Sequence, residues 1–195
     1  MDGFERRKEQ KKESIVTAAL ALFQTYGFKK VSISEIAHRA GVSQVTIYNH
    51  FVSKEGLIRE VTKKLYLDIL EQFRAIIKAE KPFLEKLKTI VFDKTQLAGQ
   101  HQGELLQEAL ATDPEFRQFI EYTWQREVNQ LMIDLFEEGK KQGYIDRKLS
   151  KEAIMLYLDI MRQGVYNSPG LPDKIKNNPK LVRDLTSLFI YGLNG

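Results

Sequence analysis

Residues 32–51 read SISEIAHRAGVSQVTIYNHF, and this stretch predicts two short helices joined by a tight turn. Ser32 is a good N-cap, and Glu35 follows three residues later, as in a capping box. Gly41 predicts the end of the first helix, because glycine adopts the left-handed conformation of a C-terminal cap at little cost. Ser43 is the next candidate N-cap, so a second short helix is expected directly after it.

This second helix, expected from about Gln44 to His50, has one apolar side and one polar side. At about 100° per residue, Ile47 lies at the centre of the apolar side, and Phe51 lies close to it. Val45 and Asn49 lie nearly opposite, and Thr46, Tyr48 and His50 lie on the flanks. Such a helix fits the major groove of DNA, with its first residues at base edges and its flanks at phosphates. A solvent-facing helix of an ordinary bundle would show the same spacing.

The residues around this stretch make the interpretation more specific. Residues 14–61, SIVTAALALFQTYGFKKVSISEIAHRAGVSQVTIYNHFVSKEGLIREV, resemble the DNA-binding domain of TetR-type (tetracycline-repressor-like) transcriptional regulators. The matching features are AALALFQTYGF, the helix and turn SISEIAHRAGVS, the recognition helix IYNHF, and SKEGLI at the start of the next helix. The resemblance covers about the first third of the chain closely, and the remainder matches in length and helical character.

Hydrophobic spacing and cap residues predict an all-α fold along the rest of the chain. Further helices are expected up to Tyr26 and over residues 54–80, 82–97, 104–111, 113–143, 150–165 and 178–193, with breaks at Gly27, Gly99–Gly103 and Asn167–Pro172. We predict two domains. Residues 1–62 form a three-helix DNA-binding head with a helix-turn-helix, and residues 63–195 form a helical body for ligand binding and dimerisation. The helix from residue 54 to 80 would link them.

Positive charge is concentrated in the head. The first 64 residues carry 12 lysines and arginines against 7 acidic residues, whereas the rest of the chain carries 18 against 19. This asymmetry predicts a polyanionic partner for the head. The cations Arg6, Arg7, Lys8, Lys11 and Lys12 lie at its start, either as a solvated helix end or as a basic arm that reaches the DNA backbone.

The expected DNA-binding residues follow from the helix face and from the resemblance. Gln44, Val45, Thr46 and Asn49 should lie nearest the bases. The resemblance implies that Ser43, Tyr48, His50 and Lys54 hold phosphates, and Ser32 completes the expected set. Lys54 is also well placed by its position in the first turn of the long helix. The expected partner is double-stranded DNA with a palindromic operator.

Two sets of residues in the body are candidates for other partners. Large, adaptable side chains near the middles of body helices suggest a pocket for a small apolar effector: Phe92, Tyr122, Trp124, Gln125, Met132, Met155 and Met161. For each of these residues taken singly, ordinary core packing is the better explanation. The last two helices are apolar on more than one side, which favours a homodimer, as the resemblance also implies. Its candidate interface comprises Leu158, Val165, Val182, Phe189 and Leu193, together with Met161.

Other functions find little support in the sequence. The chain has no cysteine, and His38, His50 and His101 belong to no metal-binding or catalytic motif, so we expect no enzyme activity, metal or cofactor. A charged N-terminus and the absence of a long apolar run predict a soluble cytoplasmic protein. We therefore expect a ligand-responsive transcriptional regulator, most simply a repressor. The alternative is a DNA-binding regulator without a small-molecule ligand, controlled by a protein partner through its body.

Overall fold

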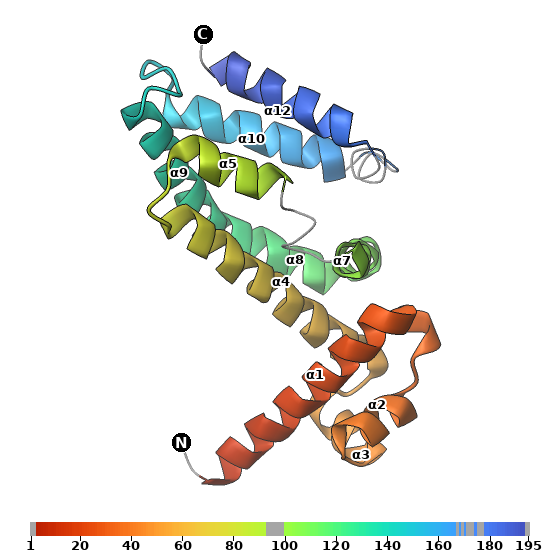
Figure 1. Ribbon diagram of the computed structural model, residues 1–195. Coiled ribbons are helices and arrows are strands. Elements are labelled where there is room, and N and C mark those ends of the chain that lie inside the picture. The colour runs from red at the N-terminus through yellow and green to blue at the C-terminus, as the bar shows by residue number, and fades with distance from the viewer. Residues whose placement is uncertain are drawn as a thin grey trace. The chain divides into compact units, whose positions relative to one another are not determined.

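The computed structural model describes residues 3–92, 100–166, 168, 170, 174 and 178–193, without the side chains of residues 91–92, 100–101, 162, 165–166, 182, 186, 189–191 and 193. Every regular element in these residues is a helix, which confirms the predicted all-α fold. The helices are α1 (Gly3–Lys30), α2 (Ile33–Ala40), α3 (Gln44–Phe51), α4 (Lys54–Lys78), α5 (Phe83–Phe92), α7 (Gln100–Thr112), α8 (Pro114–Thr123), the π-helix η1 (Trp124–Val128), α9 (Asn129–Lys141), α10 (Lys151–Tyr166) and α12 (Pro179–Leu193) (Figure 1).

Contacts between the helices divide the chain into two compact units. The first unit comprises Met1–Leu70 and Ala98–Tyr122, and the second comprises Glu71–Leu97 and Thr123–Gly195. Helix α4 therefore contributes residues to both units. The division of function between residues 1–62 and 63–195 remains a prediction.

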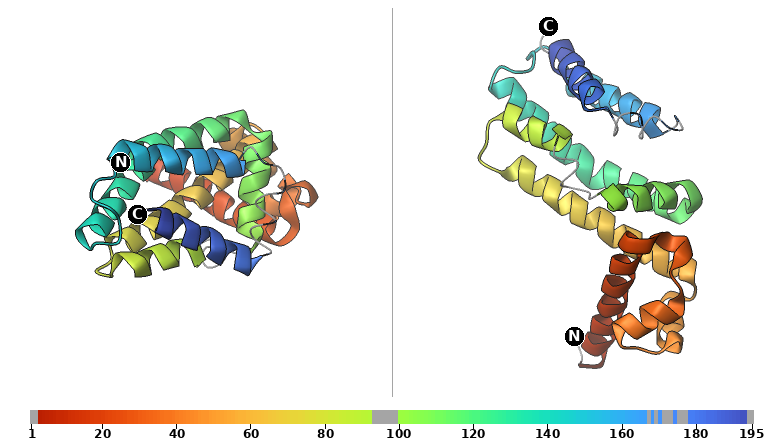
Figure 2. Two further views of the ribbon diagram at one scale, coloured as in Figure 1. Left: turned by 90° about the horizontal axis from the view of Figure 1, so that it is seen from above. Right: turned by 45° about the vertical axis from the view of Figure 1, so that its right-hand side comes forward.

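The first unit is built around one hydrophobic core beneath the helix-turn-helix pair. Helix α1 packs on α2, α3 and α7, and the right-hand view of Figure 2 shows α1 beside the short helices α2 and α3. Phe23, Ile36, Ile47 and Leu57 are completely or almost completely buried in this core, one from each of the first four helices. Helices α7 and α8 add Leu105, Ala109 and Phe116 to the same cluster. Burial of each large apolar side chain contributes about 1.5–3 kcal/mol.

Several predicted helix ends are confirmed. Gly27 has φ 76° and interrupts the helical geometry of α1, as expected of a glycine that ends a helix. Ser53 Oγ accepts a hydrogen bond from the N–H of Gly56 at 3.0 Å and caps α4. Ser150 and Asn178 cap α10 and α12 through bonds of 3.1 Å and 3.0 Å to backbone N–H groups three residues later.

The expected break at Gly99–Gly103 is wrong from Gln100 onward, because α7 begins at Gln100 and includes Gly103, and Gly99 lies outside the described residues. A glycine inside a helix costs only about 1 kcal/mol relative to alanine. The buried residues Leu105 and Ala109 lie four residues apart on the side of α7 that joins the core. Their burial offsets the cost of the glycine and fixes the helix.

The second unit joins α5 to α9 through polar and aromatic contacts. Lys86, which is almost completely buried, donates to Glu138 at 2.6 Å, and the side chain of Gln142 accepts from the N–H of Phe83 at 2.9 Å. Gly139 lies against the ring of Phe83, where any larger side chain would overlap it. The buried ion pair and the close approach of Gly139 together fix the register of α5 on α9.

Candidate nucleic-acid interface

Helix α2 is held by the capping box that its sequence predicts. The Oγ of Ser32 accepts from the N–H of Glu35 at 3.2 Å, and the Glu35 carboxylate accepts from the N–H of Ser32 at 2.7 Å. Hydrogen bonds from the Ser32 side chain and backbone lower the pKa of Glu35. Gly41 ends the helix with φ 66° and ψ 35°, which confirms the left-handed cap.

Helix α3 has the expected cap and the expected buried side. The Oγ of Ser43 accepts from the N–H of Thr46 at 3.1 Å. Ile47 is completely buried and Phe51 is almost so, and both belong to the core of the first unit. One apolar side therefore fixes α3 on α1 and α2, and the opposite side faces solvent.

The exposed side of α3 carries the residues that the sequence places nearest the bases. Val45 is 67% exposed, and Gln44 and Asn49 are also exposed. Thr46 is half-buried, and its hydroxyl lies 2.9 Å from that of Ser43. The structure thus brings these four residues to one surface, with an apolar side chain between two amides.

The candidate phosphate-binding residues surround this surface. Tyr48 is 47% exposed on one flank, and His50 is half-buried at the end of α3. Ser43 and Ser32 are exposed at the starts of α3 and α2, and Lys54 is half-buried in the first turn of α4. Helix N-termini and hydroxyl groups of this kind are common partners of phosphate oxygens.

The junction between α3 and α4 is unusually tight. Val52 has φ 64° and ψ −46°, and the N–H of Ser53 donates to the carbonyl of Phe51 at 2.7 Å, so the chain turns within three residues. A positive φ is rare for a β-branched residue. The carbonyl of Phe51 points to Gly56, where a Cβ atom would overlap it. No residue pattern in the sequence indicates this turn, although Gly56 is its necessary partner.

His50 lies in a positive environment. Partial burial lowers its pKa first, and the charges of Lys8, Lys12 and Lys11 lower it further, while Glu9 opposes them. Its ring lies 5.9 Å from that of Phe51. The lysines come from the first turns of α1, which begins at Gly3 as a regular helix. The basic segment at the chain start is thus a neighbour of α3.

An ion-pair network that the sequence analysis missed joins α4 to α8 within the first unit. Arg59 donates to Asp113 at 2.6 Å and to Glu115 at 2.7 Å. Asp113 also caps α8 by accepting from the N–H groups of Glu115 and Phe116. Partial burial would raise the pKa of Asp113, but its bonds to Arg59 and to the N–H of Phe116 hold it below the ordinary value. Arg59 and Asp113 lie 54 residues apart in the sequence, so no local residue pattern indicates that they pair.

The candidate effector-binding residues are dispersed. Tyr122 is exposed in the first unit, whereas Trp124 is half-buried and Gln125 is exposed in η1 of the second unit. Met132 is half-buried, Met161 is exposed, and the side chain of Phe92 lies outside the described residues. Met155 lines a cavity of about 10 Å³ between α9 and α10, with Ile133, Phe136 and Ile154 among its neighbours. This volume is about the least that one water molecule requires.

The π-helical turn is a feature that the sequence analysis missed. One continuous helix is expected from residue 113 to 143, but η1 at Trp124–Val128 separates α8 from α9. Single π-turns inside helices are frequent at functional sites. Trp124 begins this turn, and the boundary between the compact units falls one residue before it, at Thr123.

Most of the candidate dimer residues lie beyond the described side chains. These are Val165, Val182, Phe189 and Leu193, whereas Leu158 is described and half-buried. Met161, also a candidate, is exposed on α10 beside three exposed residues that the sequence analysis did not name. We call these four residues the α10 apolar face: Leu156, Tyr157, Ile160 and Met161. Leu188 of α12 is 70% exposed as well.

The described residues include neither a metal-binding cluster nor a membrane-spanning helix. Over the described parts of the chain, no group of three or more His, Cys, Asp or Glu side chains is placed to hold a metal ion. None of the helices in those parts is both long and apolar enough to cross a membrane.

Comparisons with known proteins agree with the geometry of α2 and α3. Residues 15–61 match the family described as "Bacterial regulatory proteins, tetR family". The chain is 27% identical over 161 residues to the fatty acid metabolism regulator protein of Bacillus subtilis, which covers 79% of this chain and 82% of that protein. It is 21% identical over 163 residues to the transcriptional repressor KstR2 of Mycobacterium tuberculosis, covering 81% and 80%.

A solved structure shows the same fold over nearly the whole chain. It is the fatty acid degradation regulator FadR from Bacillus halodurans, with a TM-score of 0.63 and 25% sequence identity. The similarity covers 94% of this chain and 96% of that one. The relatives are transcriptional regulators rather than enzymes, in agreement with the expectation from the sequence.

Proposed function

This chain belongs to the TetR family of bacterial regulatory proteins, and from that premise we propose that it represses transcription as a ligand-responsive homodimer on a palindromic operator. The observation that carries the proposal is the exposed side of α3, which presents Gln44, Val45 and Asn49 above a rigid, capped scaffold. Repression follows when the bound dimer occupies DNA that the transcription machinery needs.

The two sides of α3 suggest how DNA is read. Gln44 and Asn49 have the amide groups that pair with adenine in the major groove, and Val45 offers an apolar contact to a thymine methyl group. Ser43, Tyr48, His50 and Lys54 surround them and would bind phosphates. The recognition helices of a dimer would enter successive major grooves at a spacing of about 34–36 Å.

Two substitutions separate these roles. Asn49→Ala is expected to change the preference for one base pair of each half-site by about 1–3 kcal/mol. Lys54→Ala is expected to weaken binding to all sequences alike and to lower the slope of log affinity against log salt, because fewer counterions are released. The operator is first selected from random DNA, and affinities are then measured for single-base variants between 50 and 200 mM salt. Uniform losses in both variants would show that the roles are assigned wrongly.

Dimerisation through α10 and α12 is supported by their exposed apolar side chains. Contiguous apolar surface of this kind marks an interaction site in many proteins. The α10 apolar face and Leu188 extend the candidate set that includes Leu158 and the side chains beyond the described residues. A two-fold interface places equivalent residues against one another. It also relates the two DNA-binding heads by the same two-fold symmetry that relates the two half-sites of a palindrome.

The effector is a small, largely apolar molecule in this proposal. The cavity between α9 and α10 has about 10 Å³, so an effector bound there must separate the two helices. Helix α4 has no glycine or proline from Leu57 to Lys78 and carries residues of both units, so a displaced body would act on the head through it. The required coupling is about 1–3 kcal/mol, and it exists only if the effector prefers the displaced state.

Trp124 is the natural reporter for effector binding because it is the only tryptophan in the chain. Fatty acids of increasing length are the first compounds to titrate, since two of the relatives are named as regulators of fatty acid metabolism or degradation. An effector is expected to change the fluorescence of Trp124, to raise the melting temperature and to lower operator affinity by about 5–150-fold. A compound that saturates the protein without changing operator affinity is not its effector. If no compound class gives a signal, control by a protein partner becomes the better hypothesis.

A further inference from the structure

The first turns of α1 extend beyond the hydrophobic core of the first unit. Helix α1 begins at Gly3, but its first buried residue is Ile15. Twelve residues at about 1.5 Å each correspond to roughly 18 Å of helix. Residues 3–11 are all exposed, including Phe4, so packing does not account for this segment. We call residues 3–12 the amino-terminal arm.

The three lysines of this arm lie on one side of the helix. Ile15 and Ala19 are buried and define the side of α1 that packs on the head. At about 100° per residue around the helix axis, Lys8 points in the direction midway between these two residues. Lys11 and Lys12 lie within about 60° of the same direction. The acids Glu5, Glu9 and Glu13 lie about 60–140° away from it, on one side. The lysines thus continue the side of α1 that packs on the rest of the head.

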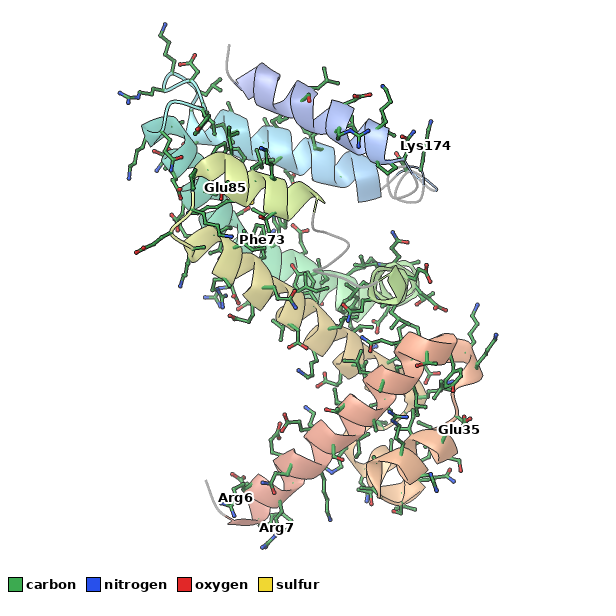
Figure 3. All side chains as sticks on the ribbon, viewed as in Figure 1. Arg6, Arg7, Glu35, Phe73, Glu85 and Lys174 are labelled. Atoms are coloured by element: carbon green, nitrogen blue, oxygen red, sulfur yellow. The ribbon has the colours of Figure 1, made fainter. Side chains whose placement is uncertain are left out.

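This lysine side lies next to the carboxyl end of α3. Helix α3 contacts α1 and lies beside its amino-terminal half in Figure 1 and in the right-hand view of Figure 2. Lys12 forms an ion pair of 3.0 Å with Glu60, which places this side of the arm next to α4. The charges of Lys8 and Lys11 act on His50 as well. Figure 3 shows Arg6 and Arg7 at the outer end of the arm.

We propose that the amino-terminal arm is a second DNA-binding element, in which Lys8 and Lys11 bind the phosphate backbone beside the major groove that α3 enters. This inference rests on the proposed function. Phosphodiesters are the suitable partner because the lysines form a row along a rigid helix, and DNA presents phosphates at regular intervals. Lysines on the backbone add affinity without reading sequence, so the arm would strengthen binding to operator and other DNA alike.

The test compares two double variants of the full chain. Lys8→Ala/Lys11→Ala removes two exposed charges from the arm and leaves the Lys12–Glu60 pair intact. Lys141→Ala/Lys148→Ala removes two exposed charges from the second unit and serves as the matched control. Affinities for a fluorescein-labelled 40-base-pair duplex, carrying either the selected operator or a scrambled sequence, are measured by anisotropy from 50 to 200 mM salt.

The arm variant is expected to bind both duplexes more weakly than the wild type. Each lost lysine–phosphate contact should lower the affinity at least about fivefold, because the attraction between two opposite charges in close contact in water has about this effect. Its salt slope should fall by about 0.9 for each phosphate that the variant leaves unneutralised, and the ratio of operator to scrambled affinity should stay constant. The control variant should match the wild type. Hydroxyl-radical footprints should lose protection only at the backbone flanking the α3 sites.

The results distinguish the inference from its premise. If the wild type binds no DNA, the proposed function fails. If the wild type binds and the arm variant has the same affinity, salt slope and footprint as the control, the arm is a solvated helix end and the inference fails. A change in base preference would also overturn it, because it would give the arm a role in sequence readout. Equal melting temperatures of the variants confirm that folding is unaffected.

Discussion

Replacing Gly56 with alanine is expected to lower the free energy of unfolding by about 1–3 kcal/mol and to weaken binding to every DNA sequence. The added Cβ would overlap the carbonyl oxygen of Phe51, and the carbonyl carbon would lie only 3.3 Å away. Backbone atoms cannot rotate aside as a flexible side chain can. The end of α3 must therefore move away from the first turn of α4.

The close approach has a structural cause in the turn at Val52. The hydrogen bond from the N–H of Ser53 to the carbonyl of Phe51 closes this turn and directs the carbonyl to Gly56. Holding Val52 at φ 64° costs about 1–3 kcal/mol, so the surrounding structure must maintain it. Alanine at position 56 would open the turn and shift Lys54 relative to the exposed side of α3. The proposed base-contacting residues of α3 and the proposed phosphate-binding residue Lys54 would then no longer be in the correct relative positions to bind the same DNA.

Urea unfolding and anisotropy titrations measure the two effects of Gly56→Ala. Gly103→Ala in α7 is the matched control, because a Cβ at Gly103 would meet no atom within 4 Å. That substitution is expected to raise stability by about 0.5–1 kcal/mol and to leave DNA affinity unchanged. A Gly56→Ala protein as stable as the wild type would show that α3 and α4 are not joined by so close a turn.

Much of the head could be predicted because its signals are local. Each cap depends on residues within three or four positions of one another, as in the pair Ser32 and Glu35 or the αL turn at Gly41. Burial of Ile47 and exposure of Val45 follow from helical periodicity alone. The sequence therefore predicts which side of α3 is exposed, whereas the contacts of that side with DNA remain a prediction.

Features that depend on distant residues could not be predicted in this way. The Arg59–Asp113 pair joins residues 54 positions apart, and nothing near Arg59 indicates its partner. The π-turn at Trp124 has no characteristic residue pattern, since one added residue per turn leaves composition unchanged. The start of α7 at Gln100 depends on packing against α1, which outweighs the low helix propensity of Gly103.

The body helices pose a further difficulty, because they are apolar on more than one side. Leu156 and Leu158 are chemically the same and two residues apart, so they point to nearly opposite sides of α10. Leu156 is 62% exposed and Leu158 is half-buried, a difference that no sequence pattern decides. The sequence predicts an apolar surface for a partner, and the structure specifies which side of α10 provides it.

Replacing Ile160 with glutamate is therefore expected to convert the proposed dimer into monomers. Ile160 is 58% exposed near the middle of the α10 apolar face, between Leu156, Tyr157 and Met161. A carboxylate in the centre of a two-fold apolar interface lies close to its own symmetry mate, and neither charge has a partner there. An unpaired buried charge costs about 3–5 kcal/mol. Because the position is exposed within one protomer, the fold of the protomer should not change.

Sedimentation equilibrium measures the assembly state, and circular dichroism checks the helical content. The Ile160→Glu protein should sediment as a monomer with the helical content of the wild type, and its operator affinity should fall by about 10²–10⁴-fold because each head now binds alone. A single half-site should bind wild type and variant with similar affinity per head. Ile160→Val keeps an apolar side chain at the same position, so this control should remain dimeric. A variant that carries glutamate at position 160 and still sediments as a dimer would place the interface on another face of the molecule.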